Sequence, residues 1–150
     1  MATSLSVRRI DPLYSTVPGS SARDVVVLPR GYVSGAPRYH DTTLDLVKAL
    51  KFEGLDASFA HDSDERQWLG EKSHLQYAID AVIGILSAGA YDGIRLLLRR
   101  RHASSPVRLR LTRQNADGSQ EWYELEGTGE DVAEAVRQLS PQSDDPELSE

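Results

Sequence analysis

Cysteine is absent from the 150-residue chain, and methionine, phenylalanine and tryptophan are scarce. Without cysteine the chain has neither a disulfide framework nor a zinc site built on thiolates. The absence is consistent with a reducing compartment. With 39% hydrophobic and 27% charged residues, a chain of this length can bury one hydrophobic core without covalent cross-links. The composition therefore predicts a single small domain.

Long apolar runs are also missing. The longest, residues 78–90, is interrupted by Asp80, Ser87 and glycines, so it is too short and too polar to span a bilayer. Residues 1–20 contain arginines but no apolar run of signal-peptide length. The net charge of −6 argues against a surface that attracts nucleic acid or anionic lipid everywhere. We therefore expect a cytoplasmic protein that does not associate with membranes.

The motifs of common catalytic and cofactor sites are absent as well. The chain contains no GxGxxG or GxxxxGK phosphate-binding loop and no HExxH zinc motif. His40 and Asp41 are adjacent and could be imagined as the base and orienting partner of a hydrolytic triad. No serine, however, lies in a GxSxG nucleophile elbow, and Asp41 suits a helix cap better. We expect no cofactor and no enzymatic activity.

An acidic loop is the sharpest metal candidate in the sequence. Residues 61–65 read His-Asp-Ser-Asp-Glu, and carboxylates converging on one point could bind magnesium or manganese. The loop lacks the glycine and the terminal glutamate of an EF-hand. Carboxylates that follow a strand also serve as ordinary loop residues and caps. We favour that structural role, and a metal-dependent enzyme using Asp62 and Asp64 is the least favoured hypothesis.

The hydrophobic pattern of the first half predicts a βαβ unit. Residues 24–28 contain four consecutive apolar residues, which is typical of a strand covered on both faces. A helix follows, capped by Asp41 or Thr42 and ended by Gly54 in a left-handed conformation. Residues 56–60 then form a second strand. The length between the two strands is that of a right-handed parallel crossover.

The second half predicts two helices, a hairpin and a closing helix. The helices cover residues 75–87 and 91–102, each with an apolar face at helical spacing. From Pro106 the period changes to two, which indicates strands at residues 107–112 and 121–126. The turn between them is Asn115-Ala116-Asp117-Gly118. The last helix is capped by Thr128.

These elements predict an α+β, two-layer domain with a mixed sheet of about four strands and helices mainly on one face. Residues 1–22 are rich in Ser, Pro and Gly and are expected to form a disordered leader. Residues 23–140 form the single domain. Residues 141–150 are acidic and poor in apolar residues, which indicates a disordered tail.

Arginines cluster in the region where the helices end and the hairpin begins. Seven of the 17 basic residues are Arg95, Arg99, Arg100, Arg101, Arg108, Arg110 and Arg113. Such a patch could contact phosphates and give a salt-dependent affinity for nucleic acid. Two structural explanations compete with that function. Cations complement a helix C-terminus, and hairpin arginines can pair with glutamates on the neighbouring strand.

One family resemblance joins these features. The run from Ala81-Val82-Ile83-Gly84 to Arg101, the strand 106–112 and the turn Asp117-Gly118 resemble the effector-associated constant component of predicted bacterial conflict systems. Members of that actinobacterial family have a Gly/Ala-interrupted apolar helix, an arginine-ended helix, a strand–turn–strand hairpin and a short last helix. The resemblance covers roughly residues 42–139. It implies a non-catalytic adaptor that couples an effector, such as a protease or nucleotide-hydrolysing protein, to a sensor.

The leading functional hypothesis is therefore a protein–protein interaction module of a bacterial multi-protein or defence-type system. Its expected contact face consists of Arg99, Arg100, Arg101, Arg108 and Arg110, with Trp122 beside them. Arginine forks would meet acidic groups on a partner. The apolar faces between residues 75 and 98 could instead support a homo-oligomer. The alternative function is nucleic-acid binding through the basic patch Arg95–Arg113, although only Trp122 and Tyr123 could add base stacking.

Overall fold

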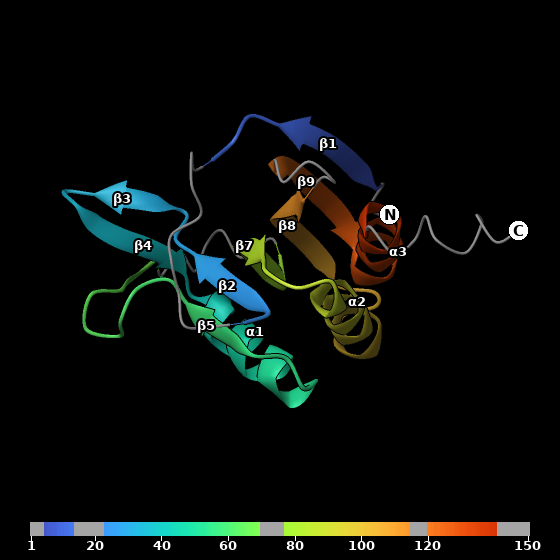
Figure 1. The fold of residues 1–150 in the computed structure, drawn as a ribbon, viewed down its shortest axis with the longest axis horizontal. Helices are drawn as coiled ribbons and strands as arrows, with labels where there is room; N and C mark the ends of the chain where they lie inside the picture. Colours follow the sequence, from blue (N-terminus) through green and yellow to red (C-terminus); the bar gives the residue numbers. More distant parts are fainter. Residues whose placement is uncertain (1–4, 14–22, 70–76, 115–119, 141–150) are drawn as a thin grey trace, which may run out of the picture.

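The computed structural model describes residues 5–13, 23–69, 77–114 and 120–140. Within those ranges it contains two β-sheets and three helices (Figure 1). The large sheet has the strand order β1 (Ser6–Ile10), β9 (Gln120–Thr128), β8 (Pro106–Gln114), β7 (Ile79–Ile85), β2 (Val25–Leu28) and β5 (Ala57–Phe59). The small sheet has the order β3 (Gly31–Val33), β4 (Ala36–His40) and β6 (Gln67–Leu69). The helices are α1 (Thr42–Phe52), α2 (Gly89–Arg101) and α3 (Gly129–Leu139).

The α+β class is confirmed, but the sheet is larger than the four strands expected from sequence. It is mixed: β7 lies parallel to β8 and β2 lies parallel to β5, while the other neighbouring pairs are antiparallel. The parallel pairing of β2 with β5 confirms the strand–helix–strand unit predicted in the first half. Two short strands, β3 and β4, are inserted between β2 and α1.

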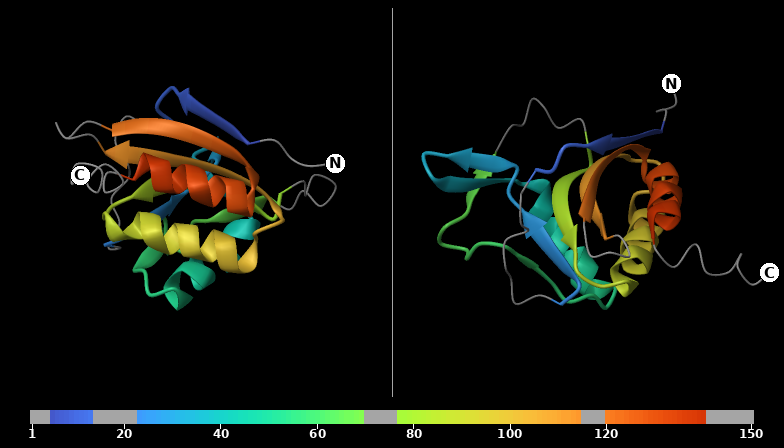
Figure 2. Two further views of the ribbon diagram at one scale, coloured as in Figure 1. Left: turned by 90° about the vertical axis from the view of Figure 1, so that its right-hand side faces the viewer. Right: turned by 45° about the horizontal axis from the view of Figure 1, so that its top comes forward.

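All three helices lie on the same face of the large sheet (Figure 2). The main core fills the space between them and the sheet, with Val25, Ile83, Leu109 and Leu125 from the strands meeting Leu97 and other helix residues. In the hairpin of β8 and β9 the predicted alternation is confirmed: Val107, Leu109 and Leu111 of β8 point to this core. The even-numbered residues, including Arg108 and Arg110, therefore point to the opposite face.

Residues 79–85 form the central strand β7, so the helix predicted for residues 75–87 is wrong. All seven residues of β7 are buried. A strand covered on both faces shows no alternation, and a short apolar run of this kind cannot be distinguished from a helix by periodicity. Ile79, Val82, Ile83 and Ile85 are β-branched, which favours the extended backbone.

Ser6–Ile10 forms β1, the edge strand that pairs antiparallel with β9. The prediction of a disordered leader does not hold for these five residues. Residues 1–4, 14–22 and 141–150 lie outside the described ranges, as do residues 115–119 of the predicted hairpin turn. None of the helices in the described part of the chain is long and apolar enough to cross a membrane.

The helix ends largely follow the sequence. Gly54, with φ of 92°, follows the end of α1 in the left-handed conformation predicted for it. The Thr128 hydroxyl accepts a hydrogen bond from Asp131 N at 3.2 Å and caps α3 as expected. Asp41 occupies the N-cap position of α1, but its side chain forms no capping hydrogen bond there.

The start of α3 lies directly against the end of α2. A Cβ atom on Gly129 would lie 1.9 Å from the carbonyl oxygen of His102, so only glycine fits at this position. The backbone N–H of Gly129 donates to Ser105 O at 2.9 Å. These contacts fix the C-terminal end of α2 in place, where it faces α1.

Candidate functional site

The structure divides the predicted arginine face between two sides of the molecule. Arg99, Arg100 and Arg101 form the last turn of α2, on the helical face of the sheet. Arg108 and Arg110 extend from β8 on the opposite face. A single contact surface made of all five side chains is therefore a wrong expectation, because the sheet lies between the two groups.

Arg108 and Arg110, two of the three arginines of β8, are held by carboxylates of neighbouring strands. Asp80 on β7 accepts two hydrogen bonds from Arg108, Nε at 3.2 Å and Nη2 at 2.7 Å. Glu124 on β9 accepts one from Arg110 Nε at 2.9 Å and also pairs with Arg8 on β1. The Arg108 and Arg110 side chains are only 24% and 19% exposed. The Arg110–Glu124 pair is the structural explanation considered from sequence, whereas Arg108 pairs with Asp80 on a strand that the sequence did not predict. Both pairs leave these arginines little surface for a partner.

Trp122 does not lie at a surface. It is 2% exposed and packs with Val26, Leu28 and Val82 in a second, smaller core on the face opposite the helices. Ile10 of β1 packs against this cluster. Trp122 is on the same side of β9 as Glu124, as the alternation predicts, but it is covered and cannot anchor a partner.

The arginines at the end of α2 have three different environments. Arg100 donates to Glu53 at 3.1 Å, linking α2 to the end of α1. The Arg101 guanidinium lies 5.2 Å from the ring centroid of Phe52. Arg99 is exposed and forms no ion pair within the described residues. Arg99 and Arg101 are thus the members of this group whose charge is not matched by a carboxylate in direct contact.

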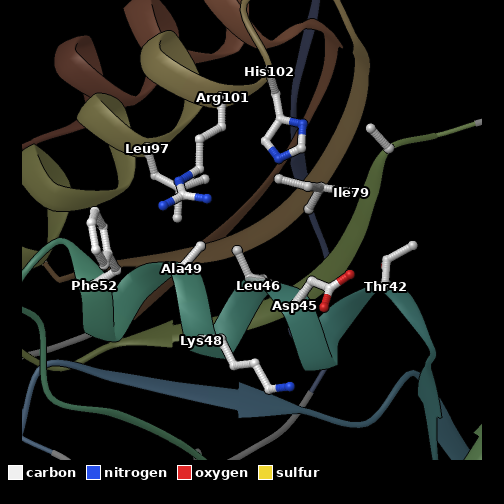
Figure 3. Close-up of a pocket in the computed structure, with 11 residues that line it drawn as sticks. Thr42, Asp45, Leu46, Lys48, Ala49, Phe52, Ile79, Leu97, Arg101 and His102 are labelled. Atoms are coloured by element: carbon white, nitrogen blue, oxygen red, sulfur yellow. The ribbon is translucent and has the colours of Figure 1, made fainter.

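Arg101 and Phe52 border a groove between α1 and α2 with a volume of about 710 Å³. Figure 3 shows Leu46, Ala49, Ile79 and Leu97 along its apolar part, and Arg101 extending from α2 toward α1. Polar groups also line it: Thr42, Asp45, Lys48 and His102. Lys48 points away from α2 in Figure 3, so Arg101 is the cation that borders the groove between the two helices, and Asp45 adds a carboxylate to its lining.

Phe52 is the residue of this groove that sequence reasoning missed. It is 77% exposed, the most exposed of the large hydrophobic side chains described. The burial of α1 follows Thr43, Leu46, Val47 and Leu50, so Phe52 lies outside the core stripe. The sequence contained one signal for an exposed Phe52. It is an aromatic residue between Lys51 and Glu53, in the last turn of the helix, and it lies outside the apolar stripe that faces the core.

His102 lies where the groove meets the start of the hairpin. Burial, together with the neighbouring charge of Arg101, lowers the pKa of His102 below its usual value. The imidazole is therefore neutral at pH 7, and can donate and accept one hydrogen bond each. The basic character of this side of the groove at neutral pH comes from Arg101.

The other candidates from sequence are placed apart from this groove. His40 faces Asp80, with Nε2 to Oδ2 at 3.6 Å, and not the adjacent Asp41. His61 lies between two tyrosine hydroxyls, those of Tyr39 at 2.8 Å and Tyr32 at 3.2 Å. In the part of the chain that the structure describes, no three His, Asp or Glu side chains are grouped closely enough to hold a metal ion.

In the acidic loop, Asp62 N donates to Glu65 at 3.2 Å, a local contact typical of a turn. This contact corresponds to the structural role favoured from sequence for the loop.

Comparisons with protein-family models, with curated proteins and with solved structures found no match to this chain. The resemblance to the effector-associated family therefore stays a prediction. One of its features is described differently by the structure, since Ala81–Gly84 belongs to strand β7 and not to an apolar helix.

Proposed function

We propose that this protein is a non-catalytic interaction module that binds an acidic, amphipathic segment of a partner protein in the groove between α1 and α2. The observation that carries the proposal is the exposure of Phe52. This large apolar side chain is 77% exposed, lines the groove and contacts the Arg101 guanidinium through its ring. Aromatic and arginine side chains are the commonest anchors of protein interfaces.

The groove has the dimensions of a peptide-docking site. Thr42, Leu46, Ala49 and Phe52 line it along one face of α1, at spacings of four, three and three residues. Ten residues of helix extend about 15 Å at 1.5 Å each. That length matches two to three turns of a helix laid into a groove, a common mode of partner recognition.

Charge supplies the orientation. Arg99 lies two residues before Arg101, about 200° around the helix, and does not line the groove. Arg101 borders the groove, so a partner carboxylate could replace water around its guanidinium. Interactions of this kind at an interface rim increase the association rate and select the register, and they contribute less to affinity than buried anchors do. The apolar floor and Phe52 would supply most of the affinity.

This proposal revises the contact face expected from sequence. Of the residues expected from sequence, Arg101 keeps its place in it, while Arg99, Arg100, Arg108, Arg110 and Trp122 are replaced by Phe52 and the apolar groove. The family resemblance implies an adaptor between an effector and a sensor in a bacterial conflict system. A groove that holds a segment of one partner is the kind of surface such an adaptor needs, and this supports the proposed assignment.

The alternative of nucleic-acid binding receives less support. Of the seven clustered arginines, Arg95, Arg100, Arg108 and Arg110 contact carboxylates of the chain itself. Phosphate binding would have to compete with these internal pairs. A gel-shift titration at two salt concentrations tests this alternative, because affinity that depends on several phosphates falls steeply with salt.

Selection of peptides from a random phage-displayed library on the immobilised full chain tests the proposal. Enriched peptides should combine an aliphatic or aromatic residue with neighbouring Asp or Glu. Their binding should be lost with Phe52→Ala and with Arg101→Glu. Leu44→Ala and Arg137→Glu are matched controls, since Leu44 is an exposed apolar residue of α1 outside the groove and Arg137 is an exposed arginine of α3. Peptides without acidic residues, or equal losses in the controls, would contradict the proposal.

A further inference from the structure

A second pocket lies on the opposite side of the large sheet, away from the α1–α2 groove. It has a volume of about 440 Å³ and is lined by residues of β1, β7, β8 and β9 and of the segments that adjoin β1 and β2. Its charged lining consists of three arginines, Arg8, Arg30 and Arg110, and two carboxylates, Asp11 and Glu124, and its apolar lining is Ile10, Leu13 and Val82. The volume is within the usual range for small-molecule sites, roughly 300–1,000 Å³.

The pocket holds three guanidinium groups and two carboxylates, and Glu124 is the carboxylate that pairs with these arginines within the described residues. Glu124 accepts from Arg8 and from Arg110, but Arg110 uses its Nε for this bond. The terminal nitrogens of Arg110 make no hydrogen bond to any residue that the structure describes. Arg30 is exposed, and its guanidinium has no ion pair within the same residues. An arginine has five N–H donors in a planar fork, so Arg30 and the terminal nitrogens of Arg110 have donors left for a ligand.

The electrostatic surroundings agree with this count. Burial lowers the pKa of His40, and the charges of Arg30, Arg108 and Arg110 lower it further against the opposing effect of Asp80. Three guanidinium groups thus act on one nearby imidazole. Arg30 and Arg110 also line the pocket, where three arginines face two carboxylates, so the charged lining is net positive and favours an anionic ligand.

We propose that this pocket binds a small organic carboxylate. Arg30 and the terminal nitrogens of Arg110 donate charge-assisted hydrogen bonds to the carboxylate oxygens. Ile10 and the exposed Leu13 contact the hydrocarbon part of the ligand. Apolar lining beside the arginines distinguishes this chemistry from that of free phosphate, which has no hydrocarbon to place there.

Three probes titrated into the full chain, followed by amide chemical shifts, test the assignment: hexanoate, the uncharged hexanamide and inorganic phosphate. Hexanoate should saturate below about 10 mM, a range that corresponds to weak specific binding. Hexanamide and phosphate should each bind at least tenfold more weakly, because one lacks the charge and the other the hydrocarbon. No saturation by hexanoate, or equal affinity for either of the other probes, would overturn the proposal.

Two arginine variants distinguish binding of hexanoate in the pocket from nonspecific attraction to positive charge. Arg30→Gln should weaken hexanoate about tenfold or more, since one charge-assisted hydrogen bond is lost. Arg23→Gln is the matched control: Arg23 is 89% exposed and pairs with Asp56 outside the pocket. Both arginines are exposed, so both variants are expected to fold, and thermal unfolding by circular dichroism checks this. Equal affinities in the two variants would overturn the role of Arg30.

Discussion

Truncation of Phe52 to alanine is the sharpest perturbation of the proposed partner groove. The side chain is 77% exposed in the free protein. A fully exposed phenylalanine has about 200 Å² available for burial, so a partner can cover about 150 Å². At 25 cal/mol per Å², complete coverage is worth about 4 kcal/mol. Because a partner in an open groove covers only part of the ring, we expect Phe52→Ala to cost about 2 kcal/mol of binding free energy, a loss of about 30-fold in affinity.

The same substitution should leave the fold almost unchanged. In the free protein Phe52 contacts the Arg101 guanidinium at 5.2 Å, and an exposed cation–π contact contributes about 0.5–1 kcal/mol. The free energy of unfolding in urea should therefore fall by no more than about 1 kcal/mol. An effect on binding that exceeds the effect on stability identifies Phe52 as an interface residue.

Fluorescence polarisation with a labelled peptide from the phage selection measures the affinity. Leu44→Ala, on the same helix but outside the groove, should bind as the unmodified protein does. Unchanged affinity in Phe52→Ala would refute the reasoning. A similar loss in Leu44→Ala would also refute it, because the loss would then reflect the helix as a whole.

Three further predictions concern the fold. Trp122→Ala should lower the free energy of unfolding in urea by about 3–5 kcal/mol, because a 2% exposed ring leaves a cavity; a change below about 1 kcal/mol would mean that the second core is not packed as described. Gly129→Ala should cost about 1–3 kcal/mol by forcing a Cβ against the His102 carbonyl oxygen, and equal melting temperatures would contradict that contact. Burial keeps the pKa values of His40 and His102 below 6.5, so the unfolded chain takes up protons first as the pH falls from that value, and stability should decrease. Replacing both histidines by glutamine should flatten this dependence, whereas an unchanged slope would exclude them as its source.

Elements with a local signature could be predicted from the sequence. The β8–β9 pairing and the Thr128 cap follow from alternation and from a single hydroxyl next to an apolar helix. Gly54 was predicted at the end of α1 because only a residue that tolerates positive φ suits that position. In each case the deciding interaction lies within a few residues or within one hairpin.

Elements that depend on distant partners could not be predicted. β1 has no apolar alternation of its own and is ordered by β9, with Arg8 and Glu124 separated by 116 positions. β7 is buried on both faces, so its sequence lacks the period that would identify a strand.

The candidate site could be predicted only in part, because it also depends on residues that are distant in the sequence. Period-two alternation placed Arg108, Arg110 and Trp122 on one face correctly, but it contains no information about what covers that face. Asp80 was expected in a helix, so its role as the partner of Arg108 was missed. The exposure of Phe52 depends on where the core of α1 ends, and that is set by strands elsewhere in the chain.

Chemical-shift mapping of a selected peptide on the isotopically labelled chain tests the central claim most directly. The account predicts shifts at Leu46, Ala49, Ile79, Leu97 and Arg101, which line the α1–α2 groove, with no change at Arg110 and Glu124 on the far face of the sheet. Shifts concentrated on Arg110 and Glu124, with the groove unaffected, would contradict it.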